Sequence, residues 1–206
     1  MRITSGIFRS RMIKAPGGIR PTLDNVRKAI FDILGEAVEG AKALDLFAGS
    51  GAIGLEALSR GAASCIFADN NRASIKAIKE NIEALVPHFH EGAGLVPHFR
   101  ESVGLLPGGA GQTGVICADF QAAVRRLYGE RAKFDIIFMD PPYYKEIAKK
   151  TLSLLADCDI LSETGVAVIE HSKHDLLPDS SGGLRLFRTA RYGDTLVSFY
   201  CKGQTK

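Results

Sequence analysis

The sequence lacks the features that would place a protein in a membrane or outside the cell. None of its apolar runs approaches the ~20 residues that a membrane-spanning helix needs. Its first segment, MRITSGIFRSRMIK, is too polar for a secretory signal; its basic character would also suit a transit peptide, but the alternating apolar residues favour a strand. The four cysteines contain no CxxC pair, so we expect reduced thiols in the core of a cytoplasmic protein. They are Cys65, Cys117, Cys158 and Cys201.

Clustered metal ligands are also lacking. A tandem near-repeat, LVPHFHEGAG (85–94) and LVPHFRESVG (95–104), contains His88, His90 and His98. No cysteine or acidic cluster accompanies them at the spacing of metal ligands, so we expect no metal site. Because a connection between a helix and a strand usually takes roughly two to six residues, we interpret the segment 85–113 as a long inserted surface loop.

The charge is unevenly distributed along the chain. The formal net charge is +3, but residues 1–28 carry +6 and the remaining residues carry −3. A cationic segment on a mildly acidic body suggests a polyanionic partner. A solvated basic hairpin is the alternative that composition leaves open.

The order of elements predicts an α/β protein. From residue 41 onward, short apolar runs at 41–47, 64–69, 114–119, 133–140 and 165–171 alternate with helical patterns at 52–60, 71–85, 120–128 and 145–157. This alternation is typical of a doubly wound parallel sheet with helices on both faces. Near the end, LRLFRTARY and TLVSFYCK flank Gly193-Asp194, which predicts a hairpin and adds antiparallel pairing.

The residues before the alternating elements predict a small extension over 1–36, preceding a main domain over 37–206. Residues 1–19 indicate a hairpin or arm, and Thr22 is a candidate N-cap for the helix that follows. Arg27 and Lys28 are expected to face away from the apolar stripe of that helix. The stripe consists of Val26, Ile30, Ile33 and Leu34.

A glycine-rich segment, LDLFAGSGAIGLEAL, follows the first expected strand and opens a helix. Gly49, Gly51 and Gly54 match the G-x-G-x-x-G pattern, so a nicotinamide dinucleotide has to be considered. Asp69, twenty residues after Gly49, ends the second strand and can accept a hydrogen bond from a ribose hydroxyl. That feature suits any cofactor that contains adenosine.

Two further acids narrow the choice of cofactor. Asp45 lies inside the first strand, where a carboxylate is costly to bury unless it has a partner. S-adenosylmethionine carries an amino group and a sulfonium and has no pyrophosphate for the helix N-terminus, so Asp45 favours it; alternatively, Asp45 only orders the glycine loop. Asp119 can accept a hydrogen bond from an adenine amino group while Phe120 packs on the adenine ring. Alternatively or in addition, Asp119 can cap the helix that follows.

The segment FDIIFMDPPYYKE (134–146) ends a buried strand abruptly. Pro141 and Pro142 have no N–H and cannot pair inside a sheet. Asp140 and Pro141 each precede a proline and are therefore held extended. The strand end thus presents a carboxylate, a backbone carbonyl and the ring of Tyr143, which together can bind an exocyclic amine and stack on its base.

These motifs carry a family resemblance. LDLFAGSGAIGLEALSRGA joined to MDPPYY resembles the S-adenosylmethionine-dependent amino methyltransferases. With RITSGIFRSR, RPTLDNVRKAIFDIL and YGDTLVSFY, the whole chain except 85–113 is similar to the bacterial 16S rRNA guanine(966)-N2 methyltransferase family. The resemblance implies a Rossmann-like class I fold, a seven-stranded sheet with its last strand antiparallel, S-adenosylmethionine as cofactor, and 16S rRNA or a small-subunit assembly intermediate as substrate. We expect a monomer.

The resemblance also implies roles for individual residues. The cofactor would contact Asp45, Phe47, Gly49, Ser50, Gly51, Asp69, Asn70, Asp119 and Phe120. The target guanine would contact Asp140, Pro141, Pro142 and Tyr143. The basic extension predicts RNA contacts at Arg9, Arg11, Arg20, Thr22 and Arg27. An amino methyltransferase for adenine-N6 of DNA or RNA, one for a protein amide, and a non-catalytic RNA-binding module stay open as alternatives.

Overall fold

The computed structural model describes residues 1–16, 24–92, 99–100, 112–143 and 146–203. The helices are α1 (Asp24–Leu34), the short 3-10 helix η1 (Gly35–Val38), α2 (Ala52–Ser59), α3 (Arg72–Gly92), α4 (Phe120–Gly129) and α5 (Ile147–Asp157). The strands are β1 (Lys42–Leu46), β2 (Ser64–Asp69), β3 (Phe99–Arg100), β4 (Gln112–Cys117), β5 (Phe134–Met139), β6 (Leu161–Ser172), β7 (Ser180–Ser181), β8 (Leu184–Tyr192) and β9 (Thr195–Lys202).

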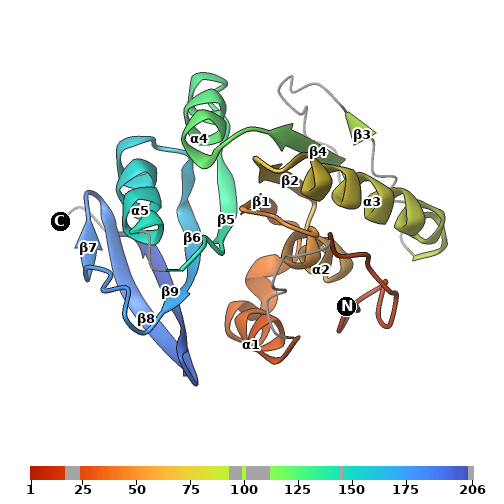
Figure 1. The fold of residues 1–206 in the computed structure, drawn as a ribbon, viewed down its shortest axis with the longest axis horizontal. Helices are drawn as coiled ribbons and strands as arrows, with labels where there is room; N and C mark the ends of the chain where they lie inside the picture. Colours follow the sequence, from red (N-terminus) through yellow and green to blue (C-terminus); the bar gives the residue numbers. More distant parts are fainter. Residues whose placement is uncertain (17–23, 93–98, 101–111, 144–145, 204–206) are drawn as a thin grey trace.

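One sheet joins all the strands of the described residues, in the order β3-β4-β2-β1-β5-β6-β9-β8-β7 (Figure 1). The pairs from β3 to β6 are parallel, and β9 runs antiparallel between β6 and β8. The predicted doubly wound sheet with an antiparallel last strand is therefore confirmed. The seven longer strands correspond to the predicted ones, and the two-residue strands β3 and β7 lie at the edges.

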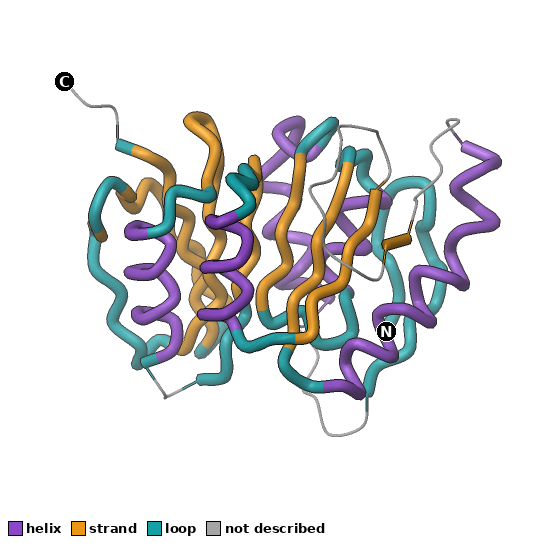
Figure 2. The backbone as a smooth tube through the Cα atoms, turned by 90° about the horizontal axis from the view of Figure 1, so that it is seen from above, coloured by secondary structure: helices purple, strands orange, loops and turns teal. Residues whose placement is uncertain are grey.

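Helices cover both faces of the sheet because every central strand is apolar on both sides (Figure 2). Alternate strand residues such as Phe67 and Phe138 pack with α1, α2 and α3 in one buried cluster. Their neighbours, such as Ile66 and Ile137, pack with α4 and α5 in a second cluster. The carboxyl ends of the parallel strands meet at one edge. The strand order reverses between β1 and β5, since β2 and β4 follow on one side and β6 on the other, and α/β proteins bind ligands at such a point.

The N-terminal segment packs against α2 (Figure 1). A single antiparallel bridge joins Arg2 and Met12, and Ile3, Phe8 and Ile13 are buried in the same cluster as α1 and α2. Residues 1–16 thus share the core of the main domain. The division into an extension over 1–36 and a domain over 37–206 stays a prediction.

The structure corrects two expectations about the chain's organisation. Helix α3 does not end at residue 85 but continues to Gly92, so residues 85–92 of the first copy of the tandem repeat are helical rather than loop. Residues 93–98 and 101–111 lie outside the described residues, as do His98 and the side chains of His88 and His90. All four cysteines are free thiols; Cys65 and Cys158 are buried, but Cys117 is exposed and so is not a core residue.

None of the described helices is long and apolar enough to cross a membrane.

Candidate active site

The centre of the carboxyl edge holds a buried carboxylate. Asp45 is 2% exposed, and its Oδ2 accepts a hydrogen bond from the N–H of Gly54 at 3.1 Å. Burial raises the pKa of Asp45 well above its usual value; the Gly54 contact opposes this, and the charges of Asp140 and Asp69 add to it. The predicted loop-ordering contact is present, and the concentration of negative charge favours a bound cation.

The glycine loop turns sharply between β1 and α2. Phe47, Gly49 and Gly51 all adopt left-handed backbone, with φ values of 67°, 56° and 76°. Such a conformation is strained for Phe47, and strain of this kind concentrates at ligand sites. Gly54 serves packing instead, because a Cβ there would lie 2.3 Å from Phe67 Cε1. The loop is therefore shaped by tight backbone turns and by the close approach of α2 to β2.

Asp69 holds the glycine loop from the neighbouring strand. Its Oδ2 accepts from the N–H of Gly49 at 2.8 Å, and its Oδ1 accepts from the N–H of Asn71 at 2.8 Å. Asn70, between them, is exposed. These contacts give Asp69 a structural role, and its predicted contact with a ribose stays a prediction.

Two aromatic rings lie beside this loop. The ring centroids of Phe47 and Phe120 are 5.3 Å apart, with the planes tilted by 36°. Asp119 caps α4, because its side chain accepts from the N–H of Ala122 at 2.9 Å. The capping role considered for Asp119 is confirmed, and an adenine contact at Asp119 and Phe120 stays a prediction.

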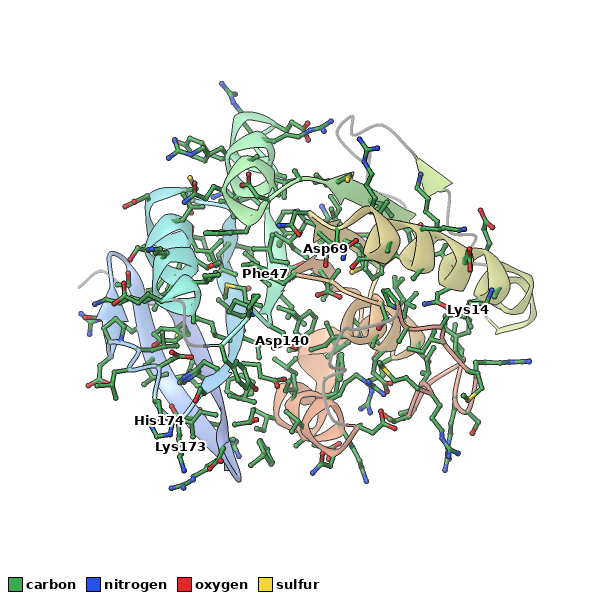
Figure 3. All side chains as sticks on the ribbon, viewed as in Figure 1. Lys14, Phe47, Asp69, Asp140, Lys173 and His174 are labelled. Carbon is green, nitrogen blue, oxygen red and sulfur yellow. The ribbon has the colours of Figure 1, made fainter. Side chains whose placement is uncertain are left out.

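The motif after β5 forms the other side of the site. Asp140 is half-buried and Pro141 is buried at the strand end. The hydroxyl of Tyr143 donates to Glu170 Oε1 at 3.0 Å and lies 3.1 Å from Thr195 Oγ1. Burial raises the pKa of Tyr143 to about 12, so the hydroxyl keeps its proton at neutral pH. Figure 3 shows Phe47, Asp69 and Asp140 in the middle of the molecule. The two acids are near enough to Asp45 for their charges to raise its pKa.

Sequence reasoning missed Glu170 and Thr195. Both are nearly buried, at 7% and 6% exposed. Glu170 is the acid in the apolar strand segment VAVIEHS of β6. A carboxylate inside an apolar strand is the same signal that makes Asp45 a candidate site residue. Thr195 opens β9 and carried no such signal.

The predicted RNA contacts divide into three groups. Arg9 and Arg11 are exposed in the N-terminal segment, as predicted residues for an interface must be. Arg20 and Thr22 lie outside the described residues. The predicted RNA contact at Arg27 is wrong, because the side chain of Arg27 is fully buried and therefore cannot reach RNA.

The burial of Arg27 has a clear physical cause. Helix α1 is buried over a wider face than its apolar stripe indicates, since the N-terminal segment covers it. The Arg27 guanidinium donates to the carbonyl of Arg2 at 2.6 Å and to Asp24 Oδ1 at 2.8 Å. Its Nε lies 3.5 Å from the buried carboxylate of Glu56. Arg27 is thus a structural cation that fastens α1, α2 and the N-terminal segment together.

Metal ligands do not gather in the described residues: no group of three or more His, Cys, Asp or Glu side chains is placed to hold an ion.

Comparison with known proteins places the chain in a family. It is 35% identical over 204 residues to the Bacillus subtilis (strain 168) protein YlbH, whose name assigns it provisionally to the rRNA methyltransferases; the match covers 98% of this chain and 99% of that protein. It is 29% identical to "Ribosomal RNA small subunit methyltransferase D" of Escherichia coli (strain K12), over 97% of this chain and 89% of that protein.

Comparison with solved structures agrees with the sequence comparison. A solved Escherichia coli structure, titled provisionally as the methyltransferase yhhF, has a TM-score of 0.78 and 27% identity, and the match covers 100% of this chain and 99% of that one. A family profile described as "Conserved hypothetical protein 95" matches residues 1–201. The chain therefore belongs to the conserved hypothetical protein 95 family.

Proposed function

We propose that the protein transfers a methyl group from S-adenosylmethionine to the exocyclic N2 amine of a guanine, at position 966, in 16S rRNA of the small ribosomal subunit. The observation that carries the proposal is the meeting of a buried acid, a glycine loop and the Asp140–Tyr143 strand end at one edge of the sheet. The small-subunit rRNA methyltransferase of Escherichia coli, matched over nearly the whole chain, supports the substrate.

The residues of the site fit this cofactor. Asp45 is a buried carboxylate with a raised pKa, which an ammonium group would stabilise. Gly49 and Gly51, which adopt left-handed backbone, have no side chains, so a ligand bound next to Asp45 can approach the backbone of the loop closely. We assign the methionine end of the cofactor to Asp45 and the Gly49–Gly51 loop.

The remaining contacts follow from the neighbouring strands. Asp69 and Asn70, at the end of β2, would hold the ribose. Phe47, Asp119 and Phe120 would hold the adenine, which suits their position beside the loop. When bound, S-adenosylmethionine supplies an electrophilic methyl group on its sulfonium.

The strand end prepares the amine of the base. An exocyclic amine is a poor nucleophile because its lone pair is delocalised into the ring. The carboxylate of Asp140 and the carbonyl of Pro141 would each accept a hydrogen bond from one N–H of the amine. The nitrogen can then become pyramidal, and its lone pair can point out of the ring plane toward the methyl group. Fixed acceptors also stabilise the positive charge that develops on this nitrogen, and they do so more strongly in the transition state than in the ground state.

The substrate has to present an unstacked guanine. A base in a single-stranded loop leaves its stack at little cost, whereas a base inside a helix does not. The exposed Arg9 and Arg11 suit contact with the phosphates that surround such a loop. We propose a monomeric cytoplasmic enzyme that acts on 16S rRNA or on an assembly intermediate of the small subunit.

Nucleoside analysis tests the proposal. The purified protein is incubated with labelled S-adenosylmethionine and with small-subunit RNA or its assembly intermediates, and the RNA is digested. Labelled N2-methylguanosine is the expected product, and it should be missing from position 966 in a strain that lacks the protein. Labelled N6-methyladenosine, or label in ribosomal protein, would overturn the assignment of guanine as the target. If neither the RNA nor the protein is labelled, the assignment as a methyltransferase is overturned.

A further inference from the structure

We infer that Glu170 and Thr195 are positioning residues that hold the Asp140–Tyr143 strand end in place through the hydroxyl of Tyr143. The inference rests on the proposed function, since it concerns the same site. It also changes the role expected for Tyr143, whose ring was predicted to act by stacking on the target base.

The contacts come from two strands on one side of the motif. Tyr143 follows β5, whereas Glu170 lies in β6 and Thr195 opens β9. Strands β6 and β9 form a long antiparallel pair in which Glu170 faces Val197 and Ser172 faces Thr195. The hydroxyl of Tyr143 thus meets two nearly buried polar groups, at 3.0 and 3.1 Å, which are both fixed to the rigid sheet.

This anchor can control the position of Asp140. Only Pro141 and Pro142 separate Asp140 from Tyr143, and two consecutive prolines leave the backbone little freedom. Fixing Tyr143 at one end and β5 at the other therefore fixes the carboxylate and carbonyl between them. Catalytic acceptors act best when they are held in place before the substrate arrives.

Replacement of Tyr143 by Phe separates the two roles, because it keeps the ring and removes only the hydroxyl. If the hydroxyl anchors the motif, Y143F should lower kcat by about tenfold or more, the scale of one lost hydrogen bond to a charged group. The affinity for S-adenosylmethionine should stay within about twofold of wild type. If Tyr143 acts by stacking alone, Y143F should leave kcat unchanged, and the inference is overturned.

A double-mutant cycle tests the partner. We expect E170A to lower kcat as Y143F does, and Y143F/E170A to lower it no further than either single change. E170Q keeps an oxygen that accepts from Tyr143 and should retain kcat within about threefold of wild type. Additive losses in the double variant, or an E170Q as impaired as E170A, would mean that Glu170 acts independently of Tyr143. Y128F is the matched control, since Tyr128 is 52% exposed on α4 and away from the motif.

Amide hydrogen exchange gives a readout that does not depend on activity. In the cofactor-free protein, the peptide that contains Asp140 and Tyr143 should exchange faster in Y143F and E170A than in wild type and Y128F, while the thermal midpoint stays close to wild type. Unchanged exchange in that peptide would refute the anchor even if the enzyme is active. Conversely, a wild-type protein that methylates no RNA would refute the proposed function. The exchange measurement would then still test whether Tyr143 and Glu170 hold the strand end in place.

Discussion

At the scale of single residues, Asp45 shows a conflict between stability and binding. Its carboxylate is buried at the centre of the sheet edge, and its main fixed donor is the N–H of Gly54. Burial, with the charges of Asp140 and Asp69, makes ionisation unfavourable in the folded protein. A cationic group on the cofactor would remove that penalty. Asp45 is thus suited to binding at the expense of the cofactor-free state.

The pH dependence of stability tests this interpretation through D45N. Because the pKa of Asp45 is raised above its usual value of 3.8, its stabilising contribution is complete below about pH 4 and is lost as the pH rises through the folded-state pKa. Asn avoids this loss and can still accept from Gly54. We therefore expect D45N to raise the thermal midpoint of the cofactor-free protein by at least about 2 °C at neutral pH, with no gain near pH 4.

The same variant should bind S-adenosylmethionine at least about tenfold more weakly, since the charge pair is lost. Thermal melts across pH and calorimetric titration measure the two effects. A D45N protein that melts at the wild-type temperature at neutral pH and binds the cofactor normally would contradict the role given to Asp45.

Asp140 should separate chemistry from cofactor binding. Loss of one fixed acceptor typically costs about 3 kcal/mol in the transition state, so D140A should lower kcat by roughly a hundredfold or more. The dissociation constant for S-adenosylmethionine should change by less than about threefold, because Asp45 and the glycine loop remain. D140N, of nearly the same shape, controls for packing. An equal loss of turnover and of cofactor affinity would place Asp140 in the cofactor site instead.

At the scale of elements, α2 and α3 connect the N-terminal segment to the glycine loop. The carboxylate of Glu56 on α2 accepts from the N–H groups of Thr4 and Ser5 at 2.7 and 3.0 Å. On α3, the buried side chain of Asn81 accepts from the N–H of Lys14 at 2.8 Å and donates to its carbonyl at 2.9 Å. Asn81 also donates to the carbonyl of Ser50 at 3.0 Å, so one amide joins the two segments.

Replacement of Asn81 by Ala should therefore affect both segments. The lost hydrogen bonds leave buried partners unsatisfied, and we expect a loss of about 1–3 kcal/mol in the free energy of unfolding. The affinity for S-adenosylmethionine should also fall, since Ser50 loses its support. N25A removes an exposed amide from α1 and serves as the control. If N81A is destabilised but binds the cofactor as wild type does, Asn81 supports the core and not the loop.

The elements also show what a sequence can and cannot predict. The alternation of apolar runs and helical patterns predicts the parallel sheet, because both faces of each central strand are buried and each strand needs a crossover. It also places Asp45, Asp69 and Asp140 at one edge, since parallel strands end together. The burial of Arg27 was not predictable in this way, because it depends on Glu56, a residue on another helix.

Two further features of the structure were not predictable from the sequence, for related reasons. Helix α3 continues past Pro87, a residue that a local pattern treats as a helix end. The pairing of Tyr143 with Glu170 joins residues 27 positions apart, one shortly after β5 and the other in the neighbouring strand β6. Strand order brings these two segments together, but the contact between hydroxyl and carboxyl depends on side-chain geometry.

At the scale of the whole molecule, the acids of the candidate site and the basic residues of the N-terminal segment lie in different places. The acids Asp45, Asp69 and Asp140 gather at the centre of the sheet edge, whereas the N-terminal segment, with Lys14, lies to one side (Figure 3). Arg27, on α1, is buried beside the carboxylates of Asp24 and Glu56, so the exposed positive charge near the N-terminus comes from residues such as Arg9 and Arg11. Electrostatic attraction of an RNA would therefore act beside the catalytic edge and not on it.

The salt dependence of RNA binding tests this arrangement. Each phosphate contact on single-stranded RNA contributes about 0.7 to the slope of log affinity against log salt concentration, so R9A/R11A should lower the magnitude of the slope by about 1.4. Cofactor binding and the thermal midpoint should be unchanged, because both side chains are exposed. K149A/K150A removes the same charge from the exposed side of α5 and should leave the slope near wild type. If the two double variants shift the slope equally, the effect is one of net charge, and the N-terminal segment is not the RNA contact.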